Sequence, residues 1–196
     1  MAELTLEKKK TALLIADFYA DMMTTVPHAV DRKVVEKTQA LQKGARQAGI
    51  LLCYSATVFR RGYIEISDRN KTFSQRKRSG RPATGFPVPL IHPSVKPAEG
   101  EVVVGKHRVN ALHGTDLELV LRANDIDTLI ILGYATSGVV LSTVRYAADL
   151  DYQLIVVDDC CSDQDPEVHN FLTQRIFPRQ AEVVTAEEVI QALTRR

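Results

Sequence analysis

The hydrophobic pattern of this chain consists of short, nearly continuous apolar runs separated by longer segments with helical spacing. Runs of strand length lie at residues 11–16, 50–57, 101–104, 128–132, 153–158 and 182–185. Strands that are apolar on both faces are typical of a parallel sheet covered by helices on both sides.

Helical patterns fall between these runs. Apolar positions recur at helical spacing from Val34 to Ala48 and stop at Gly49, and a second such run continues from Ser137 to about residue 150. Capping boxes at residues 115–118 and 185–188, and Asp165 followed by proline, open further helices. The alternation predicts an α/β fold: a three-layer α/β/α sandwich, single domain 1–196, with a six-stranded, mostly parallel, Rossmann-like sheet.

Residues 58–100 interrupt this alternation. They show little periodicity and hold five prolines, at positions 82, 87, 89, 93 and 97. The first part is strongly basic, with Arg60, Arg61, Arg69, Lys71, Arg76, Lys77, Arg78 and Arg81 against Glu65 and Asp68. Two interpretations stay open: a lid that recruits carboxylates or phosphates, or a subunit contact or solvated face.

Charge and composition exclude some classes of protein. A net charge of +1 argues against bulk nucleic-acid binding and against attachment to an anionic membrane. The basic segment also lacks interleaved aromatics beyond Phe59, Tyr63 and Phe73. No apolar run reaches membrane-spanning length, and the start lacks the long apolar region of a signal peptide. Together with the odd number of cysteines (Cys53, Cys160 and Cys161), this predicts a cytoplasmic protein with reduced thiols.

Two charged residues at strand ends are candidates for chemistry. Asp17 directly follows the first apolar run, where partial burial would raise its pKa toward a useful range for an acid or base. Its alternative role is that of a helix N-cap or a turn aspartate. Lys106 follows the run at 101–104 and could neutralise an anionic intermediate, pair with Asp17, or be a solvated loop charge. The cations at 106–108 suit an anionic substrate.

The segment Leu129–Val144 contains a sharp strand-to-helix turn. Its strand ends at Gly133, turn residues follow from Tyr134 to Gly138, and an apolar-periodic run starts at Val139. Such a turn directs backbone N–H groups into the crevice where open α/β sheets bind ligands. Any strand-to-helix connection needs similar residues, so the pattern by itself leaves both interpretations open.

The sequence predicts neither a metal nor a cofactor. The five histidines show no metal-ligand spacing, and the segment after the first strand has no glycine-rich phosphate loop. Cys160 and Cys161 close the fifth strand, where structural small residues are the favoured interpretation over a nucleophile.

Asp17, Lys106 and the turn at 133–139, taken in order, resemble the isochorismatase-like hydrolase superfamily. These cysteine hydrolases include nicotinamidases, N-carbamoylsarcosine amidohydrolases and isochorismatases, and the resemblance covers nearly the whole chain. It implies an α/β/α sandwich, a homo-oligomer (dimer or tetramer) and a cis peptide between Tyr134 and Ala135.

The resemblance places the family's nucleophilic cysteine at Val139. A valine cannot form a thioester, so thiol-based amidase chemistry is excluded at that position. The resemblance also implies that isochorismatases work without the thiol, because they cleave a vinyl ether by protonation and addition of water. This interpretation assigns Asp17 as acid/base, Lys106 as the nearby cation, and a small anionic substrate. The expected substrate-binding residues are Arg60, Lys71, Arg108, Tyr134, Ala135 and Gly138.

Two other functions stay open. One is a catalytically silent ligand-binding or scaffold homologue that kept the fold. The other is amide hydrolysis by water, with Asp17 as base and no covalent intermediate.

Overall fold

The computed structural model describes residues 4–80, 83, 85 and 90–195. The basic residue Arg81 and the prolines at 82, 87 and 89, which belong to the interruption noted above, lie outside the described residues.

The centre of the molecule is a parallel sheet with strand order β3-β2-β1-β4-β5-β6. The strands are β1 (Thr11–Ala16), β2 (Leu51–Thr57), β3 (Val102–Lys106), β4 (Thr128–Tyr134), β5 (Gln153–Ser162) and β6 (Glu182–Val184). Each of these strands pairs in parallel with its neighbours in the sheet, and β1 is buried along its whole length. The predicted fold class is confirmed, and the reason is the one that the apolar runs suggested: both faces of the sheet are covered.

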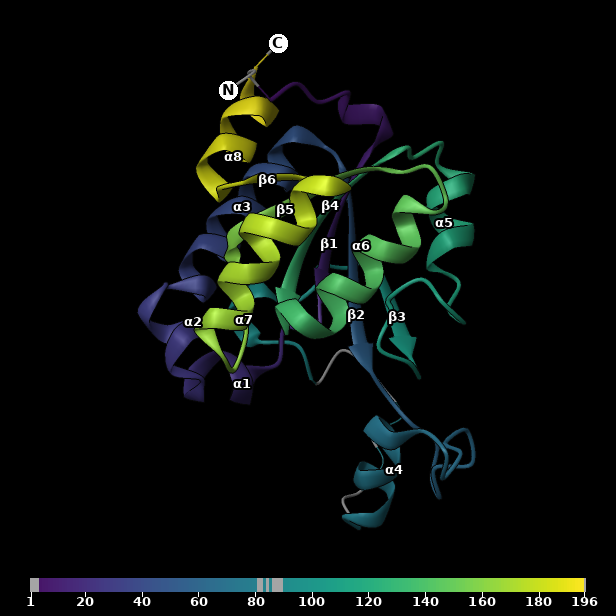
Figure 1. Ribbon diagram of the computed structural model, residues 1–196. Coiled ribbons are helices and arrows are strands. Elements are labelled where there is room, and N and C mark those ends of the chain that lie inside the picture. The colour runs from purple at the N-terminus through teal and green to yellow at the C-terminus, as the bar shows by residue number, and fades with distance from the viewer. Residues whose placement is uncertain (1–3, 81–82, 84, 86–89, 196) are drawn as a thin grey trace.

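Helices cover both faces of the sheet (Figure 1). They are α1 (Ala20–Thr25), α2 (Pro27–Asp31), α3 (Val34–Ala48), α4 (Lys71–Arg78), α5 (Leu117–Ala123), α6 (Leu141–Ala148), α7 (Pro166–Phe171) and α8 (Ala186–Thr194). Short 3₁₀ turns are η1 (Lys8–Lys10), η3 (Pro93–Val95) and η6 (Phe177–Arg179), and π turns are η4 (Thr136–Val140) and η5 (Leu172–Ile176). Helices α3 and α8 pack together, whereas α6 and α7 lie over the opposite face, as right-handed crossovers require.

Several local predictions need correction. The segment around Pro27 is not a loop, because Pro27 takes the first helical position of α2, where its missing N–H costs nothing. The region 58–100 contains the helix α4, capped by the Asn70 side chain. The predicted capping box at 115–118 is absent, because the Thr115 hydroxyl donates to the carbonyls of Ala111 and Leu112 instead. The capping box at Thr185 is confirmed.

Strands β1 and β4 are neighbours, and the chain continues from them in opposite directions, from β1 to β2 and β3 and from β4 to β5 and β6. This is the topological switch point, at whose carboxyl edge α/β proteins bind ligands. Gly133 pairs with Ala16 there, and its φ is +144°. A Cβ at Gly133 would lie 1.9 Å from the Ala16 carbonyl oxygen, so the close approach of the two strands requires glycine.

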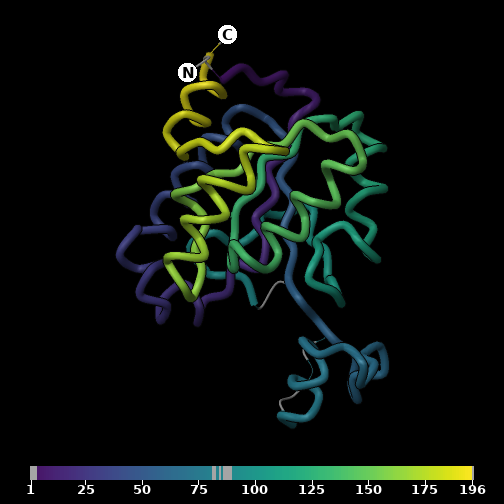
Figure 2. The backbone as a smooth tube through the Cα atoms, viewed as in Figure 1, coloured from purple at the N-terminus to yellow at the C-terminus, as the bar shows by residue number. Residues whose placement is uncertain are grey.

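Residues 58–80 form an arm that leaves the end of β2 and carries α4 away from the sheet and its helices (Figure 2). The arm has an apolar cluster of its own, made of Phe59, Tyr63 and Ile66 with Phe73 packed against it. Ile64 on the same arm is 78% exposed.

Candidate active site

Asp17 and Lys106 form an ion pair at the carboxyl edge of the sheet. Asp17 follows β1 directly, and Lys106 is the last residue of β3, paired in register with Thr57 of β2. The Lys106 Nζ lies 2.6 Å from the Asp17 Oδ2. It also donates to the Thr57 hydroxyl at 2.7 Å and to the Arg108 carbonyl at 3.1 Å. These three acceptors use all three N–H bonds of the Lys106 ammonium group. Lys106 therefore influences the site through its contact with Asp17.

Tyr19 and Thr57 complete the support of Asp17, and sequence analysis missed both. The Tyr19 hydroxyl donates to the Asp17 Oδ1 at 2.8 Å and accepts the Thr57 backbone N–H at 2.8 Å. Asp17 itself has φ +50°, a left-handed conformation that aspartate tolerates better than most residues. The N-cap alternative for Asp17 is wrong, because Tyr19 is the N-cap of α1. A tyrosine two residues after a strand-end aspartate was the one available signal.

Burial dominates the electrostatics of this pair. Asp17 is 7% exposed and Lys106 is 1% exposed. Burial raises the pKa of the Asp17 carboxyl, and the charge and hydrogen bond of Lys106 offset this only in part. Burial likewise lowers the pKa of Lys106. The pKa values of the two groups are therefore closer together than those of a surface ion pair.

The turn after β4 has the predicted cis peptide between Tyr134 and Ala135. The helix does not begin at Val139 as predicted: η4 intervenes, and α6 begins at Leu141. The Gly138 N–H donates to the Ala135 carbonyl at 3.0 Å, and the Ser137 N–H donates to the Asp163 carboxylate at 2.7 Å. The predicted anion cradle is thus occupied at Ser137 by a carboxylate of the chain itself. Val139 is 2% exposed.

The three basic residues predicted to bind substrate lie at or on the arm. The Arg60 guanidinium lies 3.6 Å from the Glu65 carboxylate. The Arg108 guanidinium donates to the carbonyls of His107 and Glu65. Lys71 begins α4, which lies apart from the sheet (Figure 1). The contacts of Arg60 and Arg108 hold the base of the arm, and the part of all three residues in substrate binding stays a prediction.

The chain is similar to known proteins of one family. The isochorismatase domain model matches residues 11–188. The chain belongs to the isochorismatase family.

An uncharacterized isochorismatase family protein, YecD, from Escherichia coli O157:H7 is 32% identical over 97% of this chain and 100% of its own length. The N-carbamoylsarcosine amidase of an Arthrobacter species is 30% identical over 82% of this chain and 61% of that amidase. Among solved structures, an isochorismatase family protein from Burkholderia thailandensis superposes with a TM-score of 0.83 at 27% identity, covering 99% of this chain and 100% of that one.

The three thiols of this family member lie inside the sheet. Cys53, Cys160 and Cys161 are all fully buried and form no disulfide. Cys53 lies in the middle of β2, opposite Leu14, rather than at the carboxyl edge. Burial raises the pKa of Cys53 and of Cys160 to about 12 and raises that of Cys161 as well. A thiolate is the reactive form, so burial makes these cysteines poor nucleophiles.

Three further features of the described residues concern metal binding, membrane spans and a cavity. Within 4–80, 83, 85 and 90–195, no group of three or more His, Cys, Asp and Glu side chains could hold a metal ion. No helix in the described part is long and apolar enough to cross a membrane. A cavity of about 880 Å³ borders Lys10, Arg46 and Gly49, at the amino-terminal ends of the strands and therefore away from Asp17.

Proposed function

We propose that this family member is a hydrolase without covalent thiol catalysis, which cleaves a small anionic vinyl ether such as isochorismate. The observation that carries the proposal is the Asp17 carboxyl, buried with a raised pKa at the switch point of the sheet. A carboxyl group with a raised pKa holds its proton to a higher pH than a free carboxyl group does, and a carboxyl that holds a proton can act as a general acid. Val139 and the three buried cysteines supply no thiolate beside it.

The reaction would proceed in two stages. Asp17 gives its proton to the terminal carbon of the enol ether, and an oxocarbenium ion forms. Water then adds to that ion, and the hemiketal collapses to pyruvate and an alcohol while a proton returns to Asp17. The pairing of Asp17 with Lys106 at 2.6 Å stabilises the carboxylate that the first stage produces. No atom of the protein becomes covalently attached.

Amide hydrolysis by water is the second candidate, because the N-carbamoylsarcosine amidase is among the relatives. Asp17 in its ionised form would then be the base that activates water, and no acyl-enzyme would form. Here Lys106 favours the form that reacts, since its charge lowers the pKa of Asp17. The two candidates thus require opposite protonation states of the same carboxyl group.

Two assays separate the candidates. Purified protein is incubated with isochorismate, and released pyruvate is measured with a coupled dehydrogenase. In parallel, N-carbamoylsarcosine and maleamate are tested for ammonia release. Pyruvate formation that is lost in Asp17→Asn supports the ether, and ammonia release lost in the same variant supports the amide. Absence of both activities would overturn the hydrolase proposal in favour of a silent ligand-binding homologue, for which a small carboxylate should still raise the melting temperature.

A thiol at position 139 tests the non-covalent mechanism. Val139→Cys should leave pyruvate release from isochorismate unchanged, and it should add a pre-steady-state burst with an amide substrate only. A chelator should leave both activities unchanged, because we propose that no metal takes part.

We further propose that the arm is a contact between copies of this chain. It projects from the rest of the molecule, its own apolar cluster is small, and Ile64 is largely exposed. Ile64→Glu should lower the molar mass measured by light scattering from that of a dimer or tetramer toward the monomer. Leu119→Glu, at a residue of α5 that is 70% exposed, is the matched control and should leave the mass unchanged. A wild-type monomer would contradict the proposal.

A further inference from the structure

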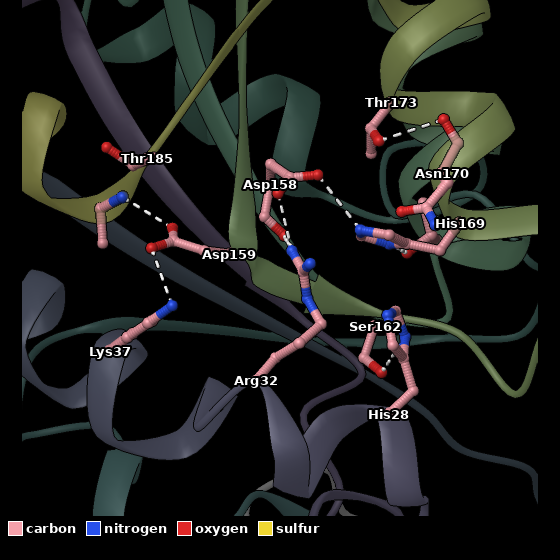
Figure 3. Close-up of polar contacts among 12 residues, drawn as sticks. His28, Arg32, Lys37, Asp158, Asp159, Ser162, His169, Asn170, Thr173 and Thr185 are labelled. Carbon is pink, nitrogen blue, oxygen red and sulfur yellow. Dashed lines mark hydrogen bonds and ion pairs between the residues drawn. The ribbon is translucent and has the colours of Figure 1, made fainter. Parts of the chain in front are cut away.

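A partly buried chain of polar contacts links the end of α2 to the turn after β4. The Arg32 guanidinium donates to the Asp158 carboxylate at 2.7 Å, and the His169 Nε2 lies 3.1 Å from the other oxygen of that carboxylate. Figure 3 shows Arg32 and His169 reaching Asp158 from two different helical segments. On its far side, the His169 Nδ1 lies 2.8 Å from the Thr136 hydroxyl.

The hydrogen-bonding roles in this chain follow from its two ends. The Asp158 pKa is held well below its ordinary value, because the hydrogen bonds of His169 and Arg32 and the Arg32 charge outweigh the effect of burial. The ionised carboxylate can only accept, so the His169 Nε2 carries a proton. Nδ1 is then free to accept the proton of the Thr136 hydroxyl. In this assignment Arg32 and the His169 Nε2 donate to Asp158, and the Thr136 hydroxyl donates to the His169 Nδ1.

The chain joins four separate elements. Arg32 follows α2, Asp158 lies in β5, His169 lies in α7, and Thr136 is the first residue of η4. Helix α2 comes shortly after Asp17 and Tyr19 in sequence, whereas η4 contains the turn position Val139. The contacts therefore tie the turn after β4 to α7, to β5 and to the end of α2.

A hydroxyl, an imidazole and a carboxylate in this order also form the nucleophilic triad of hydrolases. Burial decides against that role here. Thr136 and His169 are both 0% exposed, so no substrate can reach the Thr136 hydroxyl. A group that is closed to substrate can act only by holding another part of the site in place.

We propose that His169 is a positioning residue: by bridging Asp158 and Thr136 it holds the turn of residues 134–139 in the orientation required for turnover. The second anchor of the turn is Asp163, which accepts the Ser137 N–H. With both anchors, neighbouring residues of the turn are tied to β5 and to the segment after it. The inference deepens the proposed function, since it concerns the same site, but it can be tested without any substrate.

Amide hydrogen exchange of the folded chain measures the turn directly. The N–H groups of Gly138 and Val140 bond within the turn to the Ala135 carbonyl, so their exchange reports its opening. Thr136→Val removes the hydroxyl and should speed their exchange roughly tenfold, the loss expected for one buried hydrogen bond. Thr136→Ser keeps the hydroxyl and should restore the wild-type rates.

Thr143→Val is the matched control. Thr143 is also fully buried, and its hydroxyl accepts the Ala111 N–H at 3.1 Å, but it lies in α6 outside the chain of contacts. It should leave the Gly138 and Val140 rates within about twofold of wild type. His169→Asn supplies a second test if Thr136→Val fails to fold, because its amide can still accept from Thr136 but cannot reach Asp158.

The outcomes are decisive in either direction. Faster exchange in Thr136→Val and His169→Asn, rescue by Thr136→Ser and no effect of Thr143→Val support the positioning role. Equal acceleration by Thr143→Val, or no acceleration by Thr136→Val and His169→Asn, would overturn it. Where turnover is measurable, Thr136→Val and His169→Asn should lower kcat with KM unchanged, and Thr136→Ser should keep the wild-type kcat. If no substrate is turned over, the proposed function fails while the exchange result still decides this inference.

Discussion

Asp17 and Asp158 are both carboxylates of parallel strands next to a cation, yet their pKa values move in opposite directions. Asp17 has a 9% exposed side chain and one cationic partner, and burial raises its pKa. Asp158 has a 30% exposed side chain and two nitrogen partners, Arg32 and His169, and its pKa is lowered well below the ordinary value. Asp17 accepts from Lys106 and Tyr19, and Asp158 from Arg32 and His169, so it is the deeper burial of Asp17 that separates their pKa values.

This contrast also separates the roles of the two carboxylates. A group with a raised pKa exchanges its proton at a higher pH than a free carboxyl group, whereas a group with a lowered pKa stays ionised and is a fixed acceptor. Asp17 is thus suited to chemistry and Asp158 to holding structure. Three variants test the contrast, from the largest expected effect to the smallest.

Lys106→Met should have the largest effect, because it leaves Asp17 buried without its cation. We expect a loss of about 3–5 kcal/mol in the free energy of unfolding at pH 7, measured by urea denaturation. The loss should shrink in acid. A group whose pKa is raised in the folded state contributes most to protein stability below its unfolded pKa of about 3.9. That contribution is lost as the pH rises through the folded pKa.

The double variant Asp17→Asn with Lys106→Met removes both charges and should be more stable than the sum of the two single variants predicts. Arg122→Met, which removes an exposed ion pair with Glu118, is the control and should change stability by less than about 1 kcal/mol. A pH-independent loss in Lys106→Met would show that packing, rather than charge, explains the effect.

Asp158→Asn should have an intermediate effect, of about 2 kcal/mol at pH 7, because hydrogen bonds from Arg32 and His169 to a charged acceptor become weaker. This loss should also shrink in acid, but here because the wild type loses stability, whereas Lys106→Met recovers stability when its buried Asp17 takes up a proton. A lowered folded pKa gives stability that is present above the unfolded pKa and lost as pH falls, so wild type and variant should converge below about pH 4.

Thermal unfolding between pH 3 and pH 7 measures this convergence. Asp159→Asn is the control, since it removes the neighbouring carboxylate, which pairs with Lys37, and leaves every contact of Asp158 in place (Figure 3). The acid-dependent loss should persist in that control. A constant difference between wild type and Asp158→Asn over the whole range would contradict the ionised state of Asp158.

Tyr19→Phe should have the smallest effect on stability, about 1 kcal/mol, through loss of one hydroxyl. Its Asp17 hydrogen bond favours the ionised carboxyl, so the variant should raise the Asp17 pKa further and extend an acid-dependent activity to higher pH. Tyr54→Phe is the control, because that buried hydroxyl also donates to a carboxylate, Glu101, at 2.8 Å. The pH–rate profiles of both variants should be compared, and a shift in Tyr54→Phe alone would refute the assignment.

Much of the fold follows from local pattern. The apolar run at 11–16 and the helical run at 34–48 match β1 and α3 residue for residue, and Asp165 and Thr185 cap the helices that they were expected to open. Each of these features depends on residues close together in the chain, so periodicity and capping chemistry are enough to find them. Asp17 and Lys106 were found in the same way, as polar residues at the ends of apolar runs.

Contacts between distant segments were not predictable in this way. Thr57 and Tyr19 meet Asp17 because β2 lies between β1 and β3, and sequence analysis had no means of ordering the strands. His169 is one of five histidines without any distinguishing spacing, and its partner Thr136 is 33 residues away.

By itself the sequence determined the strands, the main helices, the family resemblance and the valine at position 139. Only the tertiary structure decided that Lys106 donates to Asp17, Thr57 and Arg108, and that the Asp163 carboxylate accepts the Ser137 N–H. The physical reason is that burial periodicity is a property of one segment. A pKa shift or a hydrogen-bond partner depends on which segments the sheet brings together.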